Sequence, residues 1–585
     1  MKPFPPSPLS FLPSPSLNRE GWGGSPLSSP LSFLLFLLSL PKQRGLGRVL
    51  ERLRVGELCS GMGRGGSPSP FSLPKQGGLG WVSSLLSLPK QGGLGEGLGG
   101  LGRVLLSLLL CHSSPTFAAT YNVRDYGAKG DATHIDSPAI NAALAQAAAD
   151  GGGTVLLPAG TYLCYSLHLQ SNVTLRLDSG AILRAAPVTD TEGYDAPEPN
   201  AYDQYQDFGH SHWHNSLMWG DSLENVTLEG QGLIDGSDVL SRGARKTAPG
   251  RQTVANKALA LRNCRHVTIR GLRFLSCGHF AMLLTGVDNL TIEDVVADTN
   301  RDGFDIDCCE QVVVRNCKVN TVNDDAIVLK CSYALGWAKP TQQVLIEDCE
   351  VSGYDVGTLI SGTRTTNTEK APDGDGPTGR IKLGTESSGG FRHITIRRCS
   401  FSHCRGLALE TVDGAAMEDV SVSHITMNDI CNSPIYIRLG DRMRAPQGFH
   451  KSTVSDIRIS HVSVTDADSR YACLIAGVEG HPVRNVHIED LSVQFRNPLT
   501  LEDVRLQRGR NPFFIPEARA ANELGEANYP EPSAHGIQPA WAFSISHARN
   551  ILLKDVTMRM AGRDERPPVY QKDTRKIRFR NVRYQ

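Results

Sequence analysis

The sequence predicts an all-β fold, a right-handed parallel β-helix with a short capping helix at its N-terminal end. One unit recurs from residue 173 onward: an alternating apolar strand, a polar pair and a second apolar run. Its apolar residues recur at spacing two, which is typical of half-buried strands and excludes a helical bundle. Starts lie 22, 23 or 26 residues apart, or further where a connection is longer, and such a repeat indicates a stacked solenoid.

The number of copies favours a β-helix over other all-β folds. A β-sandwich is possible, but it does not require the same unit so many times. A β-helix does, because one coil cannot bury its inner face alone, and stacking at about 4.8 Å per coil supplies both the core and the hydrogen bonds. Copies begin at Val173, Val226, Val267, Leu290, Val312, Val344, Ile394, Val420, Ile457, Val486, Ile551 and Ile577.

A segment of different composition precedes the repeats. "SPAINAALAQAAADGGG", residues 137–153, is rich in alanine and has apolar residues at helical spacing. A solenoid needs its open end covered. We therefore expect this segment to form the N-terminal capping helix.

The first hundred residues are unlike the remainder of the chain. Residues 1–102 repeat "SLPKQGGLG" and "GLGRVL", so we expect a low-complexity extension that is disordered or non-native. Residues 103–119 combine a basic residue, a short apolar run and small residues suited to cleavage, which predicts a signal peptide. A further piece of the leucine-rich repeat is the alternative. We expect an exported protein, secreted or periplasmic, with a single β-helix domain over residues 120–585.

Bulk composition narrows the class of partner. The 585 residues carry 60 basic and 60 acidic side chains, and this neutral balance gives no support to nucleic-acid binding. No apolar stretch reaches the roughly 18 residues that a membrane helix needs, so no membrane partner is expected after signal removal. Several cysteines end strand-like runs, where we expect stacked buried thiols; disulfide pairing cannot be read from the sequence. We expect a monomer.

Three aspartates mark the candidate site. Asp302 lies in "NRDGFDID", and Asp324 and Asp325 lie in "NDDAIVLK", one coil of about 22 residues later. The three carboxylates should therefore share one patch, where like charges raise at least one pKa and separate a general acid from a base. The alternative is that these acids only form turns. Asp305 and Asp307 share a strand face, and we expect them to be solvated or turn-stabilising.

With these motifs the chain resembles the family 28 glycoside hydrolases, the polygalacturonase-like, pectin-degrading enzymes with a pectin-lyase-like solenoid. Residues 123–163 resemble the start of that family's catalytic domain, and "NVTLEGQGLIDG" at 225–236 matches the coil before its active site. The other matches are Asn300, Arg301, Asp302 and Gly303 for the motif Asn-Thr-Asp-Gly, with Arg in place of Thr; Asp324 and Asp325 for Asp-Asp; and "GTESSGG" from residue 384 for the Gly-Ser-Glu segment.

The resemblance implies an inverting glycoside hydrolase that acts on galacturonan or rhamnogalacturonan, pectic glycans of the cell wall. It assigns Asp324 as the general acid, with Asp302 and Asp325 activating a water. Inverting enzymes hold acid and base roughly 6.5–9.5 Å apart to leave room for that water, and we expect neighbouring coils to provide the gap. The resemblance implies a polysaccharide as the partner and neither a metal nor another cofactor.

The chain departs from the family in its substrate-binding motifs. "TGRIKLGTE" has no histidine where the family has Gly-His-Gly, and Ala408 and Glu410 stand where it has the two cations of Arg-Ile-Lys. Those cations bind the galacturonate carboxylate in better-known members, so the change favours a rhamnogalacturonan-type or exo-acting relative. Other residues are then expected to contact the substrate, although Arg380 and Lys382 are equally compatible with solvated surface cations. The expected contacts are Asn300, Lys330, Arg380, Lys382 and Arg438.

Three alternatives stay open. His210, His212 and His214, at spacing two, suit a metal, although we expect them to line the site. A polysaccharide lyase would use a cation as base and carboxylates to hold calcium, and β-helices host both chemistries. A non-catalytic carbohydrate-binding or adhesive β-helix would keep the fold without the chemistry.

Overall fold

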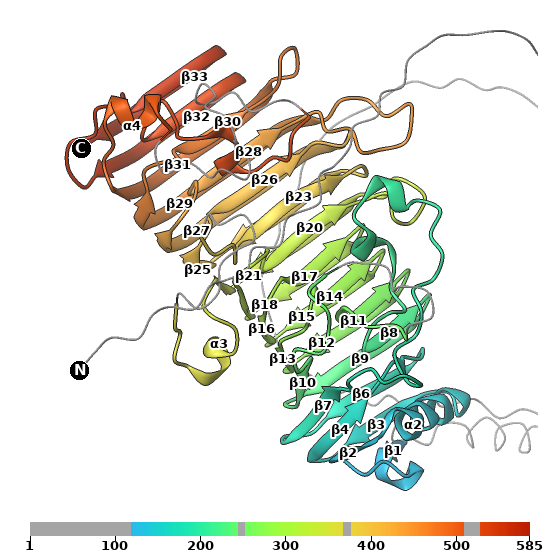
Figure 1. The fold of residues 1–585 in the computed structure, drawn as a ribbon. Helices are drawn as coiled ribbons and strands as arrows, with labels where there is room; N and C mark the ends of the chain where they lie inside the picture. The colour runs from blue at the N-terminus through green and yellow to red at the C-terminus, as the bar shows by residue number, and fades with distance from the viewer. Residues whose placement is uncertain (1–118, 244–251, 367–375, 508–526) are drawn as a thin grey trace, which may run out of the picture. The chain divides into compact units, whose positions relative to one another are not determined.

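The computed structural model describes residues 119–243, 252–366, 376–507 and 527–585 (Figure 1). All of them belong to one compact unit, Gly97–Gln585. The predicted low-complexity extension and nearly all of the predicted signal, residues 1–118, lie outside the described residues. Among the described residues, no helix is both long enough and apolar enough to cross a membrane.

The described chain folds into a parallel β-helix of 33 strands, which confirms the predicted right-handed solenoid. Most coils give one strand to each of three stacked columns, and strands of successive coils pair in parallel. We call these columns the site sheet, the repeat sheet and the third sheet. In Figure 1 they run from the blue strands β1 and β2 to the red strands β32 and β33.

The site sheet carries the candidate functional residues. Its strands are β5 (Leu167–His168), β8 (Met218–Asp221), β11 (Lys257–Arg262), β14 (Phe280–Thr285), β17 (Asp302–Asp307), β20 (Ile327–Cys331), β23 (Ile381–Ser387), β26 (Leu407–Thr411), β28 (Ile435–Leu439) and β30 (Cys473–Ala476).

The repeat sheet is built from the copies found in the sequence. Its strands are β1 (Thr120–Asn122), β3 (Gly153–Leu157), β6 (Val173–Leu177), β9 (Glu224–Gly230), β12 (Arg265–Arg270), β15 (Asp288–Glu293), β18 (Glu310–Arg315), β21 (Thr341–Glu347) and β24 (Phe391–Arg397).

The third sheet follows the repeat sheet in every coil. Its strands are β2 (Asp131–Ile135), β4 (Gly160–Cys164), β7 (Ala181–Ala185), β10 (Leu233–Asp235), β13 (Arg273–Leu275), β16 (Val296–Thr299), β19 (Lys318–Thr321), β22 (Glu350–Ser352) and β25 (Ser400–Cys404). In the last coils single long strands run through more than one column: β27 (Ala416–Ile430), β29 (Thr453–Asp468), β31 (Val483–Arg496), β32 (Phe543–Met560) and β33 (Val569–Tyr584).

Polar residues make the bends between columns. Asn172, Asn225 and Asn289 each precede a repeat-sheet copy and have left-handed backbone, with φ of 63°, 57° and 53°. Asparagine tolerates this region because its short polar side chain can bond locally. Asn225 Nδ2 also donates to Asn172 Oδ1 over 2.8 Å, so the bends bond from coil to coil.

The predicted capping helix is present as α2 (Ser137–Ala149), which packs against β3 and β5 at the N-terminal end of the stack (Figure 1). It ends before residue 153, the expected limit, because Gly151, Gly152 and Gly153 all adopt positive φ. The other helices are short: η1 (Val123–Tyr126), η2 (Asp203–Tyr205), η3 (Phe208–Ser211), α3 (Thr358–Ser361), α4 (Leu501–Arg505) and η4 (Pro532–His535).

Apart from Cys431, the cysteines of the described ranges are buried free thiols. Cys317, Cys349 and Cys399 follow strands of successive coils, and each Sγ lies 3.7–4.0 Å from a carbonyl oxygen of the preceding coil. They therefore form a stack of buried thiols along the interior, as the sequence predicted.

The site sheet is buried on both faces, unlike the repeat sheet. Along β17 and β20 every residue is buried, whereas β18 alternates between buried and partly or fully exposed residues. Phe304 and Leu329 point into the apolar core, while Asp305 and Lys330 belong to the opposite face. Charged side chains on that outer face are thus removed from water, and this places the candidate site.

Candidate active site

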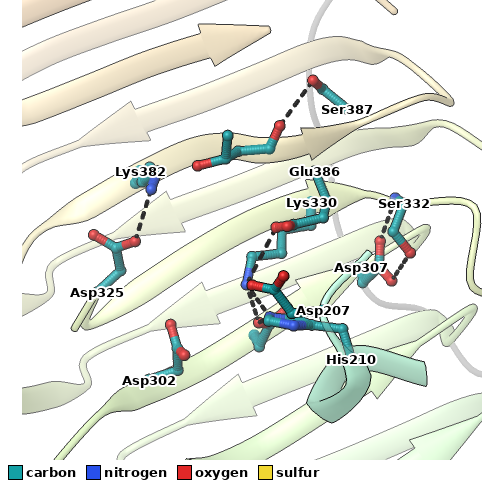
Figure 2. Close-up of polar contacts among 12 residues, drawn as sticks. Asp207, His210, Asp302, Asp307, Asp325, Lys330, Ser332, Lys382, Glu386 and Ser387 are labelled. Carbon is teal, nitrogen blue, oxygen red and sulfur yellow. Dashed lines mark hydrogen bonds and ion pairs between the residues drawn. The ribbon is translucent and has the colours of Figure 1, made fainter. Parts of the chain in front are cut away.

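The structure brings the three predicted aspartates together at the start of two adjacent strands. Asp302 begins β17, and Asp324 and Asp325 lie directly before β20. Gly303 N donates to Asp325 O over 3.0 Å, which holds the two coils in this register. One carboxylate oxygen from each aspartate lies within 4.8 Å of the other two. Figure 2 shows Asp302 and Asp325 on neighbouring coils.

The resemblance implied a gap of about 6.5–9.5 Å between the acid and base carboxyl groups. The limit of 4.8 Å applies to one oxygen atom of each aspartate and not to the separation of whole carboxyl groups, so the expected gap stays a prediction.

Burial and neighbouring charge give Asp302 and Asp324 opposite pKa shifts. Burial, reinforced by the charge of Asp324, raises the pKa of Asp302 well above its ordinary value. Burial also opposes ionisation of Asp324, but the charge and hydrogen bonds of Arg301 outweigh it and lower the pKa of Asp324. The pair therefore favours one proton on Asp302 and one charge on Asp324.

Arg301 is the residue that the resemblance placed where a threonine is expected. Its Nη2 lies 2.6 Å from Asp324 Oδ2, and its Nε donates to the same oxygen over 3.2 Å. The side chain of Asp324 keeps 24% of its surface exposed, whereas those of Asp302 and Asp325 keep 3% and 4%. Solvent therefore reaches the cluster at the Asp324–Arg301 pair.

Two predicted cations, Arg380 and Lys382, lie beside Asp325. Arg380 Nε donates to Asp325 Oδ1 over 2.8 Å, and Lys382 Nζ lies 3.2 Å from Asp325 Oδ2. Both side chains are buried, so they are not the solvated surface cations that the sequence also allowed. Lys382 Nζ also donates to Tyr529 Oη over 3.1 Å.

Arg380 also binds Glu531, a residue that the sequence did not single out. Arg380 Nη1 and Nη2 donate to the two carboxylate oxygens of Glu531 over 3.2 and 2.8 Å. Arg405 Nη1 lies 3.2 Å from Glu531, and Asn432 donates to it over 3.0 Å. Burial opposes ionisation, but Arg380 and Arg405 hold the pKa of Glu531 below its ordinary value. Glu531 lies far along the chain from every motif, so no pattern in the sequence pointed to it.

Glu410, the acid found where the resemblance expects a cation, belongs to the same cluster. It is fully buried, 3.7 Å from Lys382 and 4.0 Å from Arg380. Burial raises the pKa of Glu410 to about 7. Lys382 pairs in register with Ala408 on the next coil, so the cations that face Glu410 come from the coil before it.

Lys330 occupies a second cluster on the outer face of the site sheet (Figure 2). Its Nζ lies 2.5 Å from Asp305 Oδ2 and 2.5 Å from His210 Nε2, and 3.9 Å from Glu386. Arg444 binds Glu386 and also Asp207 over 2.8 Å. The segment around His210 is thereby fastened to the sheet.

One part of the expectation for Asp305 and Asp307, that they are solvated, is wrong. Both are fully buried rather than solvated. Asp305 pairs with Lys330, and Asp307 accepts from Ser332 N and Oγ over 2.7 and 2.6 Å. Loops that cover the sheet cause this burial, and alternation along a single strand gives no sign of them.

The two remaining predicted contact residues are Asn300 and Arg438. Asn300 is buried, and its side-chain oxygen can face the guanidinium of Arg242, whose Nε is 2.7 Å away. Arg438 is one coil beyond Glu410 in register and donates to Gly477 O over 3.0 Å.

The three histidines at spacing two do not converge. His212 and His214 lie near Asp203 and Glu198, at 3.6 and 3.8 Å. His210 alone reaches the site, where its ring nitrogen lies within 4.8 Å of oxygens of Asp302 and Asp305. The Lys330 ammonium lies within 2.5 Å of both His210 and Asp305, so a protein cation already stands among these ligand types.

Comparison with known proteins identifies relatives of this chain. A family profile described as "Rhamnogalacturonase A/epimerase, pectate lyase-like" matches residues 120–358. The chain is 25% identical over 293 residues to the "Probable polygalacturonase" of Vitis vinifera, which covers 47% of this chain and 59% of that protein. A shorter match, 42% identical over 74 residues, joins 13% of this chain to 4% of a mannuronan C5-epimerase of Azotobacter vinelandii.

A solved structure shares the fold. The family 28 exopolygalacturonase of Yersinia enterocolitica superimposes with a TM-score of 0.54 at 16% identity, covering 79% of this chain and 78% of that one. The chain spans about 59% of the length of the Vitis relative. The matches in sequence and fold confirm the resemblance to polygalacturonase-like proteins that the motifs predicted.

Proposed function

We propose that this polygalacturonase-like β-helix is an inverting glycoside hydrolase that cleaves O-glycosidic bonds in a pectic polysaccharide or oligosaccharide, galacturonan or rhamnogalacturonan. The observation that carries the proposal is the convergence of Asp302, Asp324 and Asp325 with opposed proton affinities in Asp302 and Asp324. A protonated and an ionised carboxyl at one place are what acid–base hydrolysis of a glycosidic bond requires.

Asp324 is proposed as the general acid because it is the most exposed of the three and can meet the glycosidic oxygen. The proton that it donates belongs to the Asp302–Asp324 pair, which titrates as a unit. At rest that proton is held by Asp302. It passes from Asp302 to Asp324 and on to the leaving oxygen, which leaves Asp302 ionised beside Asp325. Asp302 then accepts a proton from the attacking water, and this restores the resting state of the pair.

Export is part of the proposal. The features of residues 103–119 support a signal peptide and a secreted or periplasmic monomer that acts on cell-wall pectin.

A lyase is the nearest rival because the matching family profile also names lyase-like proteins. The cations beside the aspartates argue against it. Arg380 and Lys382 each bind a carboxylate of the protein, whereas a lyase base must be able to give up its proton, and ion pairing opposes that.

The proposal is tested by incubating purified protein with homogalacturonan and rhamnogalacturonan. Hydrolysis predicts new reducing ends without ultraviolet absorbance, and nuclear magnetic resonance should show the inverted anomer first. Absorbing unsaturated products would establish a lyase instead. Binding of a glycan with no new reducing ends would support a non-catalytic β-helix.

A further inference from the structure

The cations of the site are already bound to carboxylates of the protein itself. Lys330 holds Asp305 at 2.5 Å, Arg380 holds Asp325 at 2.8 Å, and Arg301 holds Asp324 at 2.6 Å. Lys382 lies between Asp325 and Glu410. A sugar carboxylate entering here would have to compete with an existing ion pair at each of these cations.

Glu531 fills the position that would best suit a substrate carboxylate. It takes both outer nitrogens of Arg380 in a two-pronged pair and is also bound by Arg405 and Asn432. Its side chain is 2% exposed. Such a fork is the geometry by which arginine recognises carboxylates. The protein therefore supplies its own anion to this arginine.

The acids of the protein already occupy the cations of the Asp302 cluster. Each of Arg301, Arg380, Lys382 and Arg405 faces a carboxylate, and these carboxylates belong to Asp324, Asp325, Glu410 and Glu531. Displacing one acid from its cation would leave a buried carboxylate unpaired, which is strongly unfavourable. Unpaired like charges are a common means of rejecting a wrong ligand.

We propose, on the basis of the function above, that the sugar bound at this cluster carries no free carboxylate. Its chemical class is a neutral sugar, such as the rhamnose of rhamnogalacturonan, or a uronate whose carboxyl is esterified. The glycan as a whole can still contain uronates at more distant positions.

Binding and product analysis test this separately from catalysis. Thermal shift or calorimetry with galacturonate, its methyl ester and rhamnose should show binding of one or both uncharged sugars and about 10-fold or more weaker binding of galacturonate. Products of rhamnogalacturonan and of methyl-esterified homogalacturonan then distinguish the two uncharged sources by the sugar at the new reducing end.

Glu531→Gln sharpens the test because it removes the built-in charge while keeping the shape. We expect the ratio of galacturonate to methyl-ester affinity to rise by about 10-fold. The matched control is Glu418→Gln, an exposed repeat-sheet acid paired with Arg392 at 2.9 Å, which should leave the ratio unchanged.

Two results would overturn the inference: wild-type protein that binds galacturonate as tightly as its ester, or efficient hydrolysis of unesterified homogalacturonan. If Glu531→Gln fails to fold, the wild-type comparison still decides. Absence of hydrolysis on every glycan, with the uncharged sugars still preferred in binding, would refute the proposed function and leave this inference standing.

Discussion

The repeat sheet and the site sheet share the same coil register, but their charged residues lie in different environments. On the outer face of the repeat sheet, acids and arginines alternate from coil to coil in paired positions, in the order Glu229, Arg270, Glu293, Arg315, Glu347 and Arg397. On the site sheet the ion pairs are buried under loops and share partners. Stacking explains both arrangements, and burial is the main difference between them.

This difference in burial separates surface ion pairs, which have little effect on the fold, from the buried ion pairs of the candidate site. In exposed pairs such as Arg315–Glu293 water solvates the two charges well when they separate. Each such pair therefore contributes only about 0–1 kcal/mol to the free energy of unfolding. Buried pairs cost several kcal/mol to desolvate, so the solenoid gains little stability by keeping them. A dense buried set on a single sheet therefore indicates a function.

The largest expected effect is on activity. Asp324→Asn removes the proposed acid and should lower kcat/KM by about 10²–10⁴-fold. It also leaves Arg301 without its carboxylate, so folding is checked in parallel by circular dichroism. Activity close to wild type on the best pectic substrate would contradict the assignment of Asp324.

The next effect is on stability. Arg380→Met leaves Asp325 and Glu531 buried without their shared partner, and we expect a loss of about 3–5 kcal/mol in the free energy of unfolding. Urea denaturation measures it. A loss below about 1 kcal/mol would mean that this cluster behaves like the exposed ladder.

A smaller effect is expected on the pH profile. Arg301 lowers the pKa of Asp324, so Arg301→Gln should raise that pKa and move the limb of the kcat/KM profile that Asp324 controls to higher pH. Arg301→Lys keeps the positive charge, so its pH profile should stay close to that of the wild type. Superimposable profiles for wild type and Arg301→Gln would contradict the coupling.

The smallest effect belongs to the repeat sheet. Arg315→Gln breaks an exposed pair, 2.7 Å in length, with an arginine side chain that is 51% exposed. The free energy of unfolding should fall by no more than about 1 kcal/mol, and kcat/KM should not change. A large fall would remove the contrast between the two sheets.

Much of the fold and the meeting of the three aspartates could be predicted from the sequence because both depend on the spacing of the repeats. The spacing of the repeats predicted the solenoid, and the coil-length distance from Asp302 to Asp324 and Asp325 predicted their meeting. The helix over α2 followed from composition. These are local or periodic signals, which a single sequence carries well.

The other features of the site depend on loops, and loop sequences carry no periodic pattern. Asp305 and Asp307 alternate like surface residues but are covered from above. Glu531 reaches Arg380 across 151 positions of the chain. Glu410 was recognised as a departure, but only the structure shows that the cations of the adjacent coil compensate for it.

The central claim is that the buried acids of the site sheet serve catalysis and not the fold. Asp302→Asn tests it most directly, because asparagine has nearly the shape of the protonated Asp302 that the raised pKa favours. Measured on one preparation, the free energy of unfolding should stay within about 1 kcal/mol of wild type while kcat/KM falls by about 10²–10⁴-fold. Retained activity, or a loss of stability as large as that of Arg380→Met, would contradict the claim.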